Sequence, residues 1–83
     1  MVRSLNTILD EEASEFLDTI SNNVIKARKK CGYSQLKLAI EMGYTSNAYF
    51  GRQELRTDNQ HFNIVQLYKI SKILEIDICT LLK

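Results

Sequence analysis

Apolar side chains along residues 15–31 recur with the period of an amphipathic α-helix. They follow one another at steps of four and three residues: Phe16, Ile20, Val24, Ala27 and Cys31. Basic residues fill the last turns, where the helix dipole favours cations, and Gly32 supplies a stop. The preceding residues 1–14 either extend this helix, because acidic residues suit a helix start, or form a loose acidic arm.

Two shorter helices are predicted next, over residues 34–42 and 46–54. Ser34 can cap the first with its hydroxyl, and the glycine that follows the run can terminate it. The second contains few apolar residues and starts with hydroxyl side chains, of which Thr45 or Ser46 would be the cap. A helix of this composition docks through a narrow apolar seam and leaves most of its surface exposed.

The last part of the chain predicts two more helices, over residues 63–74 and 78–82. Apolar residues in the longer one are spaced by three and four positions, and Asp77 can cap the shorter one. The chain has 83 residues, no proline, three glycines and 45% apolar residues. This length suits one domain, and the composition favours helices with short connections. We therefore predict five helices around a single core.

Charge is distributed unevenly along the chain, although the total is only +1. Residues 1–24 contain five acidic residues against one arginine, a net charge of −4. Residues 25–83 contain ten basic residues against five acidic ones, a net charge of +5. A basic body behind an acidic leader is compatible with a polyanionic partner, and equally with an ordinary solvated surface of mixed charge.

Residue types that could support catalysis or metal binding are sparse. Cys31 and Cys79 show no ligand spacing, and we expect both to be reduced and buried, although the sequence also permits one bridge between them. His61 is the only histidine and falls in a polar connection. We recognise no glycine-rich phosphate loop, signal peptide or apolar run of membrane length. We therefore expect no enzymatic activity, no metal, no cofactor, and a cytoplasmic location.

The two short helices and the turn of three or four residues between them have the spacing of a helix-turn-helix unit. In such a unit the first helix crosses the DNA backbone and the N-terminal half of the second enters the major groove. Side chains that enter must be small, polar or basic to fit the groove and reach base edges. The candidates of this kind are Thr45, Ser46, Asn47, Tyr49 and Arg52.

Residues 20–82 resemble the Cro/C1-type helix-turn-helix regulators, also called the Xre family. The segments that carry the resemblance are "IKARKKCGYSQLKLAIEMG" and "FNIVQLYKISKILEIDICTLL". The first is similar to the family pattern Arg-x-x-x-Gly-x-Ser-Gln-x-x-Leu-Ala, and the second to the closing helical segment of the family. The resemblance implies an all-α, compact, five-helix, lambda-repressor-like DNA-binding domain over residues 15–83, with residues 1–14 as a short N-terminal extension.

The resemblance also implies roles for individual residues. Gln35, at the start of the first short helix, would contact a phosphate or a base. The groove candidates named above would face the DNA, with Arg52 near the edge of the groove. Arg28 and Glu54 would form an ion pair between the longest helix and the end of the recognition helix, and we interpret that pair as structural.

The segment after the recognition helix departs from the family pattern. The family usually has glycine two residues after the glutamate, where this chain reads "ELR" at positions 54–56. Arg56 in this segment could touch a phosphate. Placing Glu54 at the family's glutamate position requires one extra residue in the turn before the recognition helix. With a turn of the usual length Gln53 takes that position, and the base-contacting residues shift by one place.

The function implied is that of a sequence-specific regulator of transcription, of repressor or controller type, which binds double-stranded DNA as a homodimer. The apolar residues that could form the dimer face are Ile76, Ile78, Leu81 and Leu82. The alternative is a non-enzymatic interaction module or antitoxin that retains the fold and uses its acidic N-terminal arm to bind a partner. A DNA-bound form should weaken with salt, which distinguishes the two hypotheses.

Overall fold

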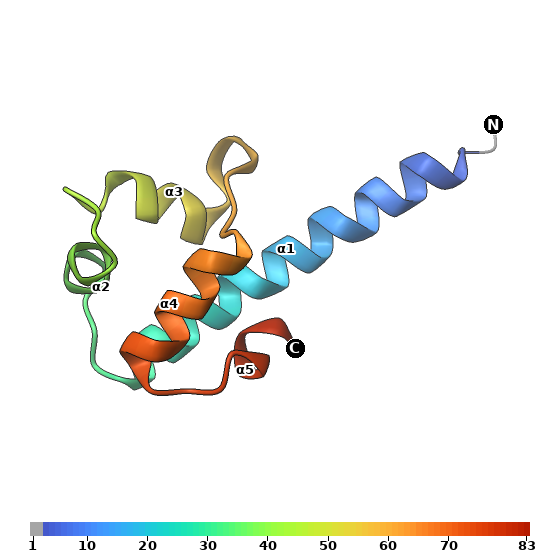
Figure 1. Cartoon of the computed structure of the whole chain (residues 1–83). Helices are drawn as coiled ribbons and strands as arrows, with labels where there is room; N and C mark the ends of the chain where they lie inside the picture. Colours follow the sequence, from blue (N-terminus) through green and yellow to red (C-terminus); the bar gives the residue numbers. More distant parts are fainter. Residues whose placement is uncertain (1–2) are drawn as a thin grey trace.

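The computed structural model describes residues 3–83, and this part of the chain is helical with no strand (Figure 1). The elements in chain order are α1 (Leu5–Lys30), α2 (Gln35–Glu41), α3 (Ala48–Leu55), the 3-10 turn η1 (Thr57–Asn59), α4 (Ile64–Leu74) and α5 (Cys79–Leu82). The prediction of five α-helices around one core is therefore confirmed for the described residues.

Helix α1 is a single helix of 26 residues that begins well before position 15. Ser4 caps it, because the Ser4 hydroxyl accepts a 3.2 Å hydrogen bond from the backbone N–H of Thr7. The second half of α1 lies in the body of the molecule, whereas the first half projects away from it (Figure 1). The radius of gyration is 14.0 Å, against about 12 Å for a compact chain of this length. From Leu5 onward the predicted extension therefore continues the helix, and residues 1–2 of it lie outside the described residues.

Side chains at the other helix starts explain why these elements begin where they do. The Ser34 hydroxyl accepts a 3.0 Å hydrogen bond from the N–H of Lys37 at the start of α2, as predicted. Asn63 and Gln66 form a reciprocal capping box at the start of α4. Asp77 accepts a 2.9 Å bond from the N–H of Cys79, and this bond lowers the pKa of the Asp77 carboxyl.

The core lies where α1, α3, α4 and α5 meet, with α2 closing one side. Its buried apolar residues are Ile20, Val24, Leu38, Ala39, Met42, Phe50, Phe62, Leu67, Ile70, Leu74 and Leu81. Phe50 is fully buried, and its ring centre lies 5.3 Å from that of Phe62 and 6.0 Å from that of Tyr44. Helix α3 therefore docks through one aromatic side chain, in keeping with its narrow apolar seam.

One residue of the predicted dimer face needs correction. Leu81 is fully buried within one copy of the chain, so it closes the core and is not available for a dimer face. Ile76, Ile78 and Leu82 are half-buried and pack against the same core. These three residues keep part of their surface exposed and stay candidates for a dimer face.

Both cysteines differ from the prediction of buried residues. Cys31 and Cys79 are exposed and carry free thiols. Cys31 continues the spacing of the buried stripe, but it lies one residue beyond the last residue of α1, and its thiol donates a 3.8 Å bond to the carbonyl of Leu74 at the surface. The bridge that the sequence permitted is therefore not formed.

Candidate nucleic-acid interface

Gln35, the first residue of α2, connects that helix to both ends of α3. Its Nε2 donates a 2.9 Å hydrogen bond to Oε1 of Glu54, and its Oε1 accepts a 2.9 Å bond from Nδ2 of Asn47. Gly51 lies between these two contacts, and a Cβ there would approach Oε1 of Gln35 to 3.2 Å. The glycine in the middle of α3 thus leaves room for the Gln35 amide, which fixes α3 relative to α2.

The ion pair expected between Arg28 and Glu54 is present and buried. Nε of Arg28 donates a 2.7 Å bond to Oε2 of Glu54, and Nη2 donates a 3.1 Å bond to Oε1. Nη1 of Arg28 also donates to the carbonyl of Tyr33 at 3.0 Å. The two side chains are 10% and 2% exposed, so this is a two-pronged pair shielded from water. The sequence left open whether Glu54 or Gln53 would face Arg28. In the structure it is Glu54.

Gln53 has a different role that the sequence did not indicate. Its Oε1 accepts a 2.9 Å bond from the hydroxyl of Tyr44, and its Nε2 donates to Oε1 of Gln66 at 2.9 Å and to the carbonyl of His61 at 3.0 Å. Nε2 of Gln66 donates back to the Tyr44 hydroxyl at 2.9 Å. The only signal in the sequence is spacing, since Gln53 follows the buried Phe50 by three residues and shares its inward face.

Burial also changes the chemistry of Tyr44. Removal of the phenol from water raises the pKa of Tyr44, while the hydrogen bonds to Gln53 and Gln66 act in the opposite direction. The phenol is therefore a neutral member of the network at physiological pH. Every fully buried side-chain N or O atom in the described part of the chain has a hydrogen-bond partner.

The groove candidates lie on the surface, four of them around the start of α3 and Arg52 in its last turn. The structure exposes Thr45, Ser46, Asn47, Tyr49 and Arg52. Helix α3 begins at Ala48, two residues later than predicted, and α2 ends at Glu41, one residue earlier, so six residues and not three or four separate the two helices. Asn47 takes the cap position, but its side chain bonds to Gln35 and not to the helix. The hydroxyl of Ser46 accepts a 3.3 Å bond from the N–H of Ala48.

Arg56, like Gln35 and Asn47, is a candidate whose side chain bonds within the protein. Its Nε donates a 2.9 Å bond to Oδ1 of Asp18, its Nη2 donates to the hydroxyl of Ser14 at 3.0 Å, and its Nη1 donates to the carbonyls of Asn59 and Gln60. The Arg56 side chain is only 11% exposed. The predicted phosphate contact is therefore replaced by a structural role, which ties the loop after α3 to α1.

Arg56 also has an unusual backbone conformation. Its φ is +58°, the left-handed conformation that a glycine usually supplies after a helix. Four hydrogen bonds from one guanidinium hold a residue with a Cβ in this conformation. Helix α3 therefore ends in the left-handed conformation without a glycine.

Comparison with protein-family models, with curated proteins and with solved structures gives no match for this chain. Between residues 3 and 83, no helix has both the length and the apolar character needed to cross a membrane. Within the same residues, no group of three or more His, Cys, Asp or Glu side chains is placed to hold a metal ion.

Proposed function

We propose that the protein is a sequence-specific regulator of transcription, of repressor or controller type, that acts in the cytoplasm as a homodimer on double-stranded DNA. The observation that carries the proposal is the polar surface at the start of α3, held against α2 by Gln35. This surface combines hydroxyl, amide, phenol and guanidinium groups within a short stretch of chain. Such groups can donate hydrogen bonds to base edges in the major groove and accept hydrogen bonds from them.

The contacts behind this surface support the same proposal. Gln35 holds the amide of Asn47, and the pair of Arg28 with Glu54 holds the far end of α3. A surface that is already ordered loses less conformational entropy on binding than a mobile one. Arg52 is exposed and can supply the two-pronged contact to guanine that gives the strongest base discrimination. Neutralisation of phosphates by basic side chains would add affinity without sequence preference.

The test is selection from a pool of random double-stranded DNA sequences at two salt concentrations. We expect enrichment of an inverted repeat with half-sites about 34 Å apart, and weaker binding at the higher salt concentration. Arg52→Ala should lose sequence preference and fold normally. Lys83→Ala removes the same charge beside α5, on the other side of the body from α3 in Figure 1, and should keep the preference.

A second candidate function rests on the projecting acidic half of α1. In this case the protein would be an interaction module or antitoxin that uses this helix to bind a basic partner and does not bind DNA. No enrichment and no salt-dependent DNA binding in the selection would favour this candidate. Equal sequence preference in Arg52→Ala and the wild type would instead show that the groove residues are wrongly assigned.

A further inference from the structure

The projecting half of α1 carries an apolar face that the described chain leaves exposed. Leu5 is 70% exposed, and Leu9 and Phe16 are each 50% exposed. Positions 5, 16 and 27 are spaced by eleven residues, which is about three helical turns. Leu5, Phe16 and Ala27 therefore lie on one face of α1, although only the last of them lies in the body of the molecule.

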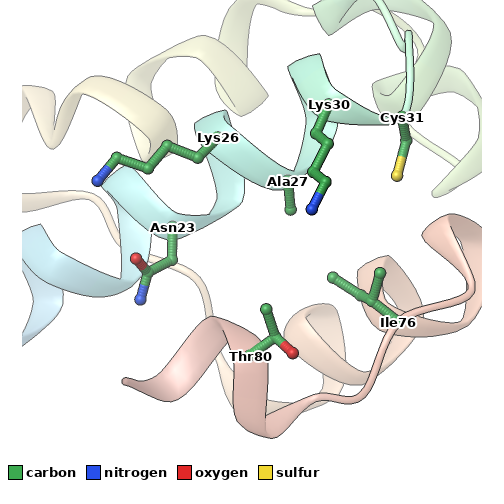
Figure 2. A pocket seen from close by; sticks show the side chains of 7 residues that line it. All are labelled: Asn23, Lys26, Ala27, Lys30, Cys31, Ile76 and Thr80. Carbon is green, nitrogen blue, oxygen red and sulfur yellow. The ribbon is translucent and has the colours of Figure 1, made fainter.

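At Ala27 this face borders a groove between the second half of α1 and the segment that leads into α5 (Figure 2). The groove has a volume of about 420 Å³. It is lined by Asn23, Lys26, Ala27, Lys30, Cys31, Ile76 and Thr80. Figure 2 shows the side chains of Ala27 and Ile76 facing each other across the groove, while the lysines extend from its α1 wall. An apolar groove beside two lysines suits an amphipathic helix with acidic edges.

The two halves of α1 carry opposite charge. Residues 3–18 contain five acidic residues and one arginine, a net charge of −4, whereas residues 19–30 contain four basic residues and no acidic one. Of those four, Arg28 is neutralised by Glu54, so three lysines remain. Two copies of α1 placed side by side in antiparallel orientation bring unlike charges together twice, whereas a parallel pair brings like charges together.

The positions of individual charges fit one particular register. Glu12 and Lys30 are eighteen residues apart, which is about five turns, so they lie on the same edge of α1. Glu15 and Lys26 are eleven residues apart, about three turns, and share an edge in the same way. The midpoint of Glu12 and Lys30 is residue 21 and that of Glu15 and Lys26 lies between residues 20 and 21, so the two midpoints differ by half a residue. A two-fold axis between residues 20 and 21 brings Glu12 opposite Lys30 of a second copy, and Glu15 opposite Lys26 of that copy, at the same time.

We propose that two copies of this chain exchange their projecting helices, so that residues 9–18 of each lie antiparallel in the groove of the other. With the axis between residues 20 and 21, residues 10–18 lie opposite the α1 wall of the groove from Asn23 to Cys31. Both segments span about 13 Å, so the helix covers the whole wall. Phe16 provides the apolar contact within the groove, Leu9 lies at its end beyond Cys31, and the two lysines of the groove pair with Glu12 and Glu15. This interface rests on the homodimer of the proposed function and names the surface that forms it; because the test uses no DNA, its failure leaves the assignment of the groove residues on α3 untouched.

The test measures the mass of the full chain in solution without DNA, by sedimentation over a range of concentrations. We expect a dimer, and we expect Phe16→Asp to raise its dissociation constant at least tenfold while the circular dichroism stays unchanged. Leu36→Asp is the matched control, because Leu36 is 51% exposed but lies on α2. A wild-type monomer at all concentrations, or the same dissociation constant for both variants, would overturn the proposal and leave the face to a different protein.

A charge exchange tests the register. Glu12→Lys and Lys30→Glu should each weaken the dimer several-fold, because each places like charges opposite one another across the two-fold axis. The double variant should recover most of the loss, and a rise in salt concentration should weaken the wild-type dimer more than either single variant. The antiparallel arrangement would be overturned if the dissociation constant of the double variant rose by the product of the two single fold-changes.

Discussion

Nε of Arg28 lies 2.7 Å from Oε2 of Glu54, and this bond links the longest helix of the molecule to the end of the proposed recognition helix. Oε1 of Glu54 accepts a further bond from Gln35, which in turn holds Asn47 at the start of the same helix. A buried charge pair thus stabilises the fold and positions an exposed surface through one continuous set of hydrogen bonds.

Removal of one partner from this pair should be costly. Glu54→Ala leaves the Arg28 charge buried without a counterion, so we expect the free energy of unfolding to fall by about 3–5 kcal/mol. Urea unfolding followed by circular dichroism measures the change. The double variant Arg28→Met/Glu54→Leu should be much more stable than Glu54→Ala. Equal loss in both variants would mean that packing around the pair, and not the unpaired charge, is responsible.

The Tyr44 hydroxyl should contribute stability through its bonds to Gln53 and Gln66. Tyr44→Phe removes a donor and an acceptor from a buried network, and we expect a loss of about 1–3 kcal/mol in the free energy of unfolding. Tyr68→Phe is the control, because Tyr68 is 53% exposed, and it should change the stability by less than about 0.5 kcal/mol. Similar values for the two variants would contradict the role given to the network.

The burial of Tyr44 also predicts a loss of stability in alkaline solution. Burial raises the pKa of Tyr44, so the folded chain keeps the phenol proton at a pH where the unfolded chain releases it. The contribution of this group is fully present below about pH 10 and is lost as the pH rises through the folded pKa. The phenolate absorbance should therefore appear at a higher pH in the native chain than in the unfolded chain.

The control for the alkaline effect is Tyr44→Phe, which lacks the titrating group. Tyr33 also has a raised pKa, first because of desolvation and then because of Glu41, so both chains share that contribution. The stability of the wild type should fall more steeply than that of Tyr44→Phe between about pH 9 and pH 11. Parallel curves would assign the alkaline loss to other groups.

Gly51 gives a test of the contact between α2 and α3. Alanine is favoured over glycine in a helix by about 0.5–1 kcal/mol, but at this position its Cβ would press on the Gln35 amide. We expect Gly51→Ala to leave the stability nearly unchanged and to shift the side-chain amide resonances of Gln35 and Asn47. In a Gln35→Ala background the same substitution should become stabilising. If it stabilises both backgrounds equally, Gln35 does not pack on Gly51.

Local patterns predicted the five helices well, because caps and apolar periods are properties of neighbouring residues. The Ser34 cap follows from such neighbours, whereas the pairing of Arg28 with Glu54, 26 residues apart, was implied only by the family resemblance. The start of α3 could not, because Asn47 bonds to Gln35, twelve residues away, and does not cap its own helix. Its position depends on a contact between two helices that no single window of sequence contains.

The remaining differences have the same origin. Arg56 resembles any basic loop residue in sequence, yet its partners Asp18 and Ser14 lie 38 and 42 residues away. The apolar spacing of α1 runs from the projecting half into the core without a break, so spacing alone does not reveal where the body begins. Cys31 continues that spacing, and its exposure follows only from the position at which neighbouring elements stop covering the helix.

Helix α1 consequently contains two regions of different local stability within one unbroken element. Among the described residues, side-chain hydrogen bonds from α1 to the rest of the fold begin at Ser14, and those ahead of it stay within the same helix or its cap. A helical segment this short is marginal in water without tertiary support. In the monomer, at concentrations below the dimer dissociation constant, backbone amides near residue 9 should therefore exchange with deuterium at low protection, whereas those near Val24 should open only with global unfolding. Any partner that covers the first half of the helix would raise its protection toward that of the core.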